Sequence, residues 1–133
     1  MPLIIDGWNL IRNKRSDIED IDTDALVSAR ILISYLEQFQ SLHSDPIILV
    51  FDSRNEFLDM EYNNTPKLKI VPAKNADAYI KRYIDKTPER QRRNVRVVSS
   101  DNDVFYYAKH SYATPIKCEE FWDKIRGRPH VSR

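Results

Sequence analysis

The sequence predicts an α/β protein in which a mainly parallel sheet of about five strands carries helices on both faces. Short apolar runs alternate along the chain with longer segments in which apolar residues recur at helical spacing. The clearest run, Ile47 to Phe51, is apolar throughout and rich in β-branched residues, as in a strand covered on both faces. Turn-forming residues such as Ser44-Asp45-Pro46 separate the two kinds of segment. These observations together predict a three-layer α/β/α sandwich.

The first half of the chain is expected to contain two strands and one long helix. A short strand covers Leu3–Ile5, and the polar segment 12–22 is expected to be a loop. The helix begins after Thr23, a suitable N-cap, and ends near His43. Its apolar residues recur three or four positions apart on one face, at Ala25, Ala29, Leu32, Leu36 and Phe39. The strand Ile47–Phe51 follows.

The second half is expected to hold three more strands, each followed by a helix. The strands cover 68–71, 95–99 and 115–117. The first of these helices begins after the N-cap Asn75, ends at Thr87-Pro88 and turns Ile80, with Tyr83 or Ile84, towards the sheet. The other two helices cover 100–108 and 119–125. Residues 1–126 are expected to form a single domain, and residues 127–133 a basic, mobile tail.

Composition excludes several classes of protein. The 133 residues are 41% hydrophobic and 31% charged, which is typical of one soluble globular domain. The lone Cys118 excludes an internal disulfide and a structural zinc site, and favours a reducing compartment. No apolar run approaches the ~20 residues of a membrane span, and the first residues lack the basic region of a signal peptide. We therefore expect a cytoplasmic protein without a membrane association.

Glycine occurs only at Gly7 and Gly127. Glycine-rich dinucleotide sites, P-loops and the nucleophile elbow of α/β hydrolases are therefore excluded, because each needs at least two closely spaced glycines.

Charge is distributed unevenly along the chain. Residues 1–65 carry 5 Lys and Arg against 12 Asp and Glu, whereas residues 66–133 carry 16 against 8. A basic half of this kind is suited to a polyanion such as RNA, although a solvated surface is the commoner explanation of any single cluster. The candidate RNA-binding residues are Lys74, Lys81, Arg90, Arg92 and Arg93.

Aspartates follow the predicted strands. Asp6 comes directly after the first strand, Asp52 after the second, and Asp101 and Asp103 after the fourth, while Asp77 lies in the first turn of a helix. Each one alone fits a turn, an N-cap or a charge at a helix start. In open α/β sheets, however, ligands bind at the carboxyl ends of the strands. The pattern therefore favours a site at this edge.

Carboxylates that crowd together repel one another unless they bind cations or share protons. Because no His or Cys lies in these motifs, the expected ion is Mg²⁺ or Mn²⁺, which in such sites acts on phosphate groups. Gly7 would permit a close backbone approach or a positive φ, and Asn9 would orient a carboxylate or a metal-bound water. Ser99 and Ser100 would donate to a carboxylate or phosphate, or cap the helix. A metal-dependent nuclease fits this set.

Four motifs resemble, in order, those of NYN domains, and of the YacP-like branch in particular, within the PIN-like nuclease superfamily. They are Ile4-Ile5-Asp6-Gly7-Trp8-Asn9-Leu10-Ile11, Val50-Phe51-Asp52, Asn75-Ala76-Asp77-Ala78-Tyr79-Ile80 and Val97-Val98-Ser99-Ser100-Asp101-Asn102-Asp103. The likeness runs from the first strand to near Phe121. Two residues depart from the pattern: Trp8 replaces the usual Tyr, and Val104 stands where many members have Phe.

The resemblance implies a PIN-like α/β/α sandwich and a Mg²⁺- or Mn²⁺-dependent endoribonuclease acting on single-stranded or ribosome-associated RNA. It also implies metal ligands at Asp6, Asp77 and Asp101, with Asp103 as a fourth, often through water. Asn9 joins these four as a catalytic residue. Asp52, Ser100 and Gly7 are expected to support the site.

Three other functions compete with this interpretation. Asp101-Asn102-Asp103-Val104 also fits the phosphatase signature D-x-D-x-[TV], but only 30 residues follow Asp103 and that family needs a catalytic domain there. A receiver-like phosphoacceptor domain would need adjacent acids after the first strand. The remaining alternative is a non-catalytic RNA- or ribosome-binding adaptor of the same fold, which would have no reason to keep the acidic set. A protein partner or a homodimer is left open.

Overall fold

The structure is a computed structural model and describes residues 2–18, 25–53 and 64–127. Within these residues five strands, all parallel, form one sheet in the order β3-β2-β1-β4-β5. The strands are β1 Leu3–Asp6, β2 Ile47–Asp52, β3 Leu68–Ala73, β4 Arg96–Val98 and β5 Thr114–Ile116. The predicted fold class is confirmed.

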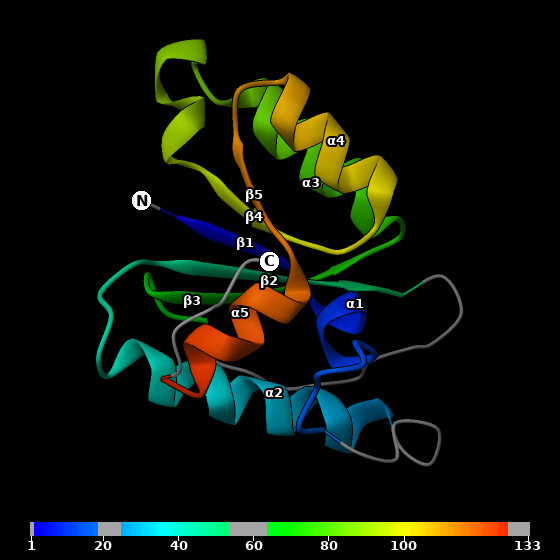
Figure 1. Ribbon diagram of the computed structural model, residues 1–133, viewed down its shortest axis with the longest axis vertical. Helices are drawn as coiled ribbons and strands as arrows, with labels where there is room; N and C mark the ends of the chain where they lie inside the picture. Colours follow the sequence, from blue (N-terminus) through cyan, green and yellow to red (C-terminus); the bar gives the residue numbers. More distant parts are fainter. Residues whose placement is uncertain (1, 19–24, 54–63, 128–133) are drawn as a thin grey trace.

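Helices cover both faces of the sheet (Figure 1). Helices α3 (Ala76–Lys86) and α4 (Asn102–His110) lie on one face, and α1 (Gly7–Ile11), α2 (Ala25–Gln40) and α5 (Cys118–Ile125) lie on the other. Side chains of β1 alternate between the two cores: Ile4 packs with α3 and α4, while Leu3 and Ile5 pack with α2 and α5. Because β1 is buried on both faces, it is apolar at every position before Asp6.

The order of the strands places a topological switch beside β1. The chain passes from β1 to β2 and β3 on one side, and then crosses through α3 to β4 and β5 on the other side. Leu3 to Ile5 pair in parallel with Arg96 to Val98, so the carboxyl ends of β1 and β4 lie next to each other. A crevice at such a point is where open α/β sheets bind their ligands.

Several predicted boundaries are confirmed. The side chain of Asn75 caps α3 by accepting a hydrogen bond from the Ala78 N–H at 3.1 Å. On that helix Ile80 and Ile84 are buried, whereas Tyr83 is half-buried. Thr23, the expected cap of α2, and 128–133 of the expected tail lie outside the described residues.

Other boundaries differ from the prediction. Helix α4 begins at Asn102 rather than at residue 100, because Asp101 is its N-cap and accepts from the Val104 N–H at 3.1 Å. Helix α2 ends at Gln40, three residues early. Helix α1 and the short 3₁₀ helix η1 (Glu89–Asn94) were not predicted. Five or six residues are too few to display a helical period, and η1 has no buried residue to mark a face.

Gly7 lies in a tight contact with β2 rather than at a positive φ. A Cβ atom at this position would lie 2.5 Å from Cε1 and 2.6 Å from Cδ1 of the Phe51 ring. That ring is fully buried, and its centroid lies 4.8 Å from the Trp8 ring, so it has little room to move. The first residue of α1 is therefore glycine because helix and strand touch here.

We expect Gly7→Ala to lower the free energy of unfolding by about 1–3 kcal/mol through overpacking. Urea denaturation followed by circular dichroism measures the change. The double variant Gly7→Ala/Phe51→Leu should recover part of the loss, because the smaller side chain makes room for the methyl group. An unchanged urea midpoint in Gly7→Ala would contradict the packing described.

Both edge strands of the sheet contain a proline. Pro72 lies in β3 and Pro115 lies in β5. Proline has no backbone N–H and is confined to edge strands and bulges, so both residues occupy positions that a central strand would not tolerate.

No described helix has the length and apolar character that a membrane crossing requires.

Candidate active site

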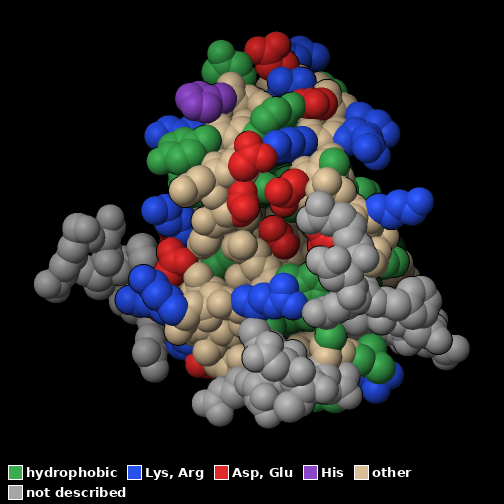
Figure 2. All heavy atoms as spheres, turned by 90° about the vertical axis from the view of Figure 1, so that its right-hand side faces the viewer, with side chains coloured by type: hydrophobic (Ala, Val, Ile, Leu, Met, Phe, Trp, Pro, Cys, Tyr) green, Lys and Arg blue, Asp and Glu red, His purple; other side chains and the backbone are tan. Residues whose placement is uncertain are grey.

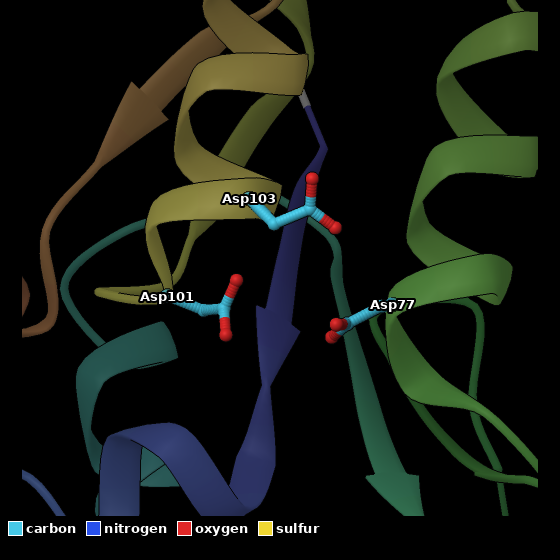
Figure 3. Close-up of side chains that lie close together, drawn as sticks. All are labelled: Asp77, Asp101 and Asp103. Atoms are coloured by element: carbon cyan, nitrogen blue, oxygen red, sulfur yellow. The ribbon is translucent and has the colours of Figure 1, made fainter.

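Three aspartates meet at the carboxyl edge of the sheet (Figure 3). Asp77 lies in the first turn of α3, Asp101 is the N-cap of α4, and Asp103 lies in the first turn of α4. One carboxylate oxygen from each side chain lies within 4.8 Å of those from the other two. The carboxylates turn towards a common space. The structure thus brings together three of the four predicted metal ligands.

The starts of α3 and α4 favour negative charge at this place. The backbone N–H groups at a helix N-terminus carry a partial positive charge, which stabilises nearby anions. Asn75 and Asp101 cap these helices with side-chain oxygens, so both helix starts are fixed in position. Two helix N-termini therefore offset part of the repulsion among the three carboxylates.

Asp6, the fourth predicted ligand, ends β1 beside this group. Its side chain is buried, with 7% of its surface exposed. Burial, together with the negative charges of Asp77, Asp101 and Asp52, raises its pKa from 3.8 to about 7, although the nearby Asn9 backbone N–H acts to lower it. A bound cation would offset the same repulsion that raises this pKa.

Asp103 lies at the exposed rim of the acidic group. Its carboxylate forms an ion pair with the Lys81 ammonium, with Nζ and Oδ2 2.6 Å apart, and its side chain is 69% exposed. The Lys81 ammonium also lies 5.3 Å from the centre of the Tyr107 ring. The predicted RNA-binding residue Lys81 is therefore adjacent to the acidic group, and its positive charge partly neutralises that of Asp103.

A hydrogen-bond network holds the loop that carries Asp101. Asn9 Oδ1 accepts from the Ser100 backbone N–H at 2.7 Å and from the Cys118 thiol at 3.1 Å. Ser100 Oγ donates to Glu119 at 2.8 Å and accepts from the Cys118 N–H at 2.9 Å. The loop is thus tied to both α1 and α5. Ser100 was expected either to donate to a carboxylate or phosphate or to cap the helix. It donates to a carboxylate, that of Glu119, which was not predicted as a site residue.

We expect Asn9→Ala to lower both stability and the RNA cleavage that the family resemblance implies. The substitution leaves the partly buried Ser100 N–H without its acceptor, which costs about 1–3 kcal/mol, and it loosens the loop before Asp101. Loss of a group that orients a metal ligand typically reduces activity by roughly 10–100-fold. Thermal unfolding and an RNA cleavage assay measure the two effects. Normal cleavage by Asn9→Ala would contradict a role for Asn9 in positioning Asp101.

A cleft of about 530 Å³ opens beside the acidic group. Asp6 and Asp52 line it from the ends of β1 and β2, and Asp77 lines it from α3. The Asp52 backbone carbonyl accepts from the Trp8 indole N–H at 2.8 Å. The other lining residues come mainly from α1 and the loop after it, namely Trp8, Asn9, Arg12, Asn13 and Lys14 with Ala76 and Ser100.

Cations surround the acidic side chains at this edge. Figure 2 shows acidic side chains near the middle of the face, with Lys and Arg side chains above and below them. Arg12 and Lys14 line the cleft but were not among the predicted site residues, because segment 12–22 carries no periodic pattern. Lys74 lies exposed in the turn between β3 and α3, at the same edge.

Three predicted RNA-binding residues lie elsewhere. Arg90, Arg92 and Arg93 belong to η1, which precedes β4 and therefore lies at the amino edge of the sheet. Arg92 donates to the backbone carbonyls of Thr87 at 3.0 Å and Asp85 at 3.3 Å, at the end of α3. The structure does not bring these arginines near the carboxylates. A contact between them and RNA stays a prediction.

Comparison with known proteins agrees with this architecture. The family profile of the YacP-like NYN domain matches residues 3–131. The crystal structure of Rae1 (YacP) from Bacillus subtilis superimposes with a TM-score of 0.74 at 17% sequence identity, covering 96% of this chain and 74% of that chain. A single-residue mutant of Rae1 (YacP) superimposes with a TM-score of 0.72 at 18% sequence identity, covering 96% of this chain and 75% of that chain. At this identity the similarity shows the fold. No curated protein matches the sequence.

Proposed function

Because the chain belongs to the YacP-like NYN domain family of the PIN-like nuclease superfamily, we propose that it is a metal-dependent endoribonuclease. The family resemblance predicted from the four motifs is confirmed. One observation carries the proposal: three aspartate carboxylates have oxygens within 4.8 Å of one another, beside a buried fourth aspartate and an open cleft. Cleavage of single-stranded or ribosome-associated RNA is the proposed reaction.

The donor set fits a hard divalent cation. The three close side chains offer only carboxylate oxygens, which Mg²⁺ and Mn²⁺ prefer. Asp77 and Asp101 would hold the ion together with Asp6, and Asp103 would act from the rim, where Lys81 already pairs with it. When bound, such an ion neutralises phosphate charge and lowers the pKa of water.

The residues of the chain would perform the remaining tasks. The N-termini of α3 and α4 favour negative charge at this edge and so favour a phosphate group beside the aspartates. Asn9 and Ser100 hold the Asp101 loop in place. Cys118 is not the nucleophile, because burial raises the pKa of its thiol to about 12. Hydrolysis by water is therefore favoured over a covalent thiol intermediate.

The test is cleavage of a labelled single-stranded RNA with Mg²⁺, with Mn²⁺ or with EDTA. We expect cleavage with either metal, none in EDTA, and recovery when excess Mg²⁺ is added. Asp77→Asn should be inactive. Asp85→Asn is the matched control, because Asp85 lies at the far end of the same helix and the new amide oxygen can still accept from Tyr107.

Binding without cleavage in every metal would favour the non-catalytic adaptor. Cleavage that persists in EDTA would contradict a metal-dependent mechanism. The cytoplasmic location, a protein partner and a homodimer stay predictions from the sequence.

A further inference from the structure

We propose that Arg12 and Lys14 form a phosphate-binding wall of the cleft, which holds single-stranded RNA next to the cleavage point. The inference rests on the proposed function for the identity of the ligand and goes beyond it by naming which residues select a single strand.

The two cations lie across the cleft from Asp77. Arg12 follows α1 directly, and α1 covers the sheet face opposite to α3, where Asp77 lies. Arg12, Lys14, Asp6 and Asp77 nevertheless line the same cleft. The five residues of α1 separate Asp6 from Arg12 and advance about 7.5 Å along the helix axis, so Arg12 lies roughly one or two nucleotides away from Asp6. A chain with one phosphate at the aspartates would thus have a neighbouring phosphate near Arg12.

Arg12 is held on a rigid support. Its guanidinium carbon lies 5.3 Å from the centre of the Trp8 ring, within the range of a cation–π contact. The Trp8 ring packs on Phe51, and its indole N–H donates to the Asp52 carbonyl at 2.8 Å. The guanidinium therefore loses less side-chain freedom when it binds a phosphate.

The loop that carries Lys14 is held on both sides. Asn13 Nδ2 donates to Glu119 Oε1 at 2.5 Å, and Arg15 Nη1 donates to both carboxylate oxygens of Asp123 at 3.0 and 2.9 Å. Asp123 is buried in α5, and Arg126, the C-cap of α5, also donates to the Arg15 carbonyl. Lys14 itself is exposed between these two anchors. Its ammonium is thus presented to solvent from a fixed backbone.

Charge and size point to a single strand. An acidic pocket alone repels RNA, so cations beside it are needed to bring the backbone of the substrate close. Pockets of roughly 300–1,000 Å³ hold molecules of the size of one or two nucleotides, and the cleft of about 530 Å³ falls within this range. A duplex presents two backbones, and a cleft of this volume does not hold both.

The test measures the binding of fluorescein-labelled oligouridylate by anisotropy, in EDTA and over a series of KCl concentrations. The double variant Arg12→Ala/Lys14→Ala should bind roughly tenfold more weakly at low salt. Its plot of log K against log[KCl] should be shallower by about 1.4, because two phosphate contacts to a single strand are lost. Loss of packing alone would not change this slope. The single variant Lys14→Ala, which alters one exposed side chain, should give about half the change in slope.

The matched control is Lys86→Ala/Lys109→Ala, which removes the same charge from exposed positions in the last turns of α3 and α4. We expect it to bind with nearly the affinity and slope of the unmodified protein. Equal losses in the two double variants would overturn the inference, since net charge would then explain both. A fully paired hairpin that binds as tightly as the oligouridylate would overturn the preference for a single strand.

These outcomes separate the inference from the proposed function. Binding is measured without metal, so a protein that fails to cleave RNA still tests the phosphate-binding wall. Conversely, if Arg12→Ala/Lys14→Ala cleaved RNA with an unchanged KM, the phosphate-binding role of the two residues would be wrong, and the proposed nuclease activity would still stand. Melting temperatures of all variants verify that each one is folded.

Discussion

Asp101→Asn should lower the rate of RNA cleavage by at least about 100-fold while RNA affinity and stability stay close to normal. The reason for the loss is that the neutral amide is a poor ligand for a divalent cation, and even the loss of a group that only orients a metal ligand costs roughly 10–100-fold in activity. Stability is retained because Asp101 also caps α4 through Oδ1, which accepts from the Val104 N–H at 3.1 Å. Asparagine is an equally good N-cap.

Comparison of two substitutions separates the two roles of this side chain. Asp101→Ala removes both the charge and the cap, so it should be inactive and also less stable by about 1 kcal/mol. Single-turnover cleavage and urea denaturation measure the two effects, with Asp85→Asn as the active control. If Asp101→Asn cleaved RNA within about threefold of the normal rate, the carboxylate would have no part in metal binding.

Without metal at pH 8, the Asp6→Asn variant should be more stable than the unmodified protein. With metal, it should not cleave RNA. Burial and the neighbouring carboxylates raise the pKa of Asp6 from 3.8 to about 7. Between these pH values the unfolded chain has lost the proton that the folded protein keeps, so the free energy of unfolding falls as pH rises from about 4 to about 7. Each pKa unit is worth about 1.4 kcal/mol, so the full loss is roughly 4 kcal/mol. The neutral amide avoids this loss.

Urea denaturation in EDTA at pH 5 and pH 8 tests this expectation. The unmodified protein should lose stability between the two pH values, whereas Asp6→Asn should lose much less. Added Mg²⁺ should stabilise the unmodified protein at pH 8 more than it stabilises Asp6→Asn, because only the former keeps all its carboxylate ligands. A variant that is less stable than the unmodified protein at pH 8 would show that the Asp6 carboxylate is favourably paired in the folded state.

The sheet was predictable because burial on both faces makes its strands apolar. Leu3–Ile5 and Ile47–Phe51 show this pattern clearly, and both are strands. The boundaries of α4 were less predictable, since Ser99, Ser100 and Asp101 are all suitable caps and the hydrogen bond to Val104 decides among them. Helix α1 is stabilised by contacts with β2 and α2 that no local pattern records.

The residues of the candidate site also fall into two groups, those that the sequence predicts and those that it does not. The acidic residues could be predicted because each of them follows a strand or begins a helix, and parallel topology brings such positions to one edge. Glu119 and Arg12 could not be predicted, because their roles arise from contacts between segments that are distant in the sequence. Glu119 accepts a hydrogen bond from Asn13, 106 positions away. Arg12 lies over the ring of Trp8, whose indole N–H is bound by the last residue of β2.

The prolines of the two edge strands bear on self-association. An open sheet can recruit a strand from another molecule through the unpaired amide groups of its edges. Pro72 in β3 and Pro115 in β5 each remove one donor from that row, and β3 also carries the exposed Lys69. Strand-by-strand growth into aggregates is thereby disfavoured at both ends of the sheet. A second copy of the chain would have to bind through helices or loops.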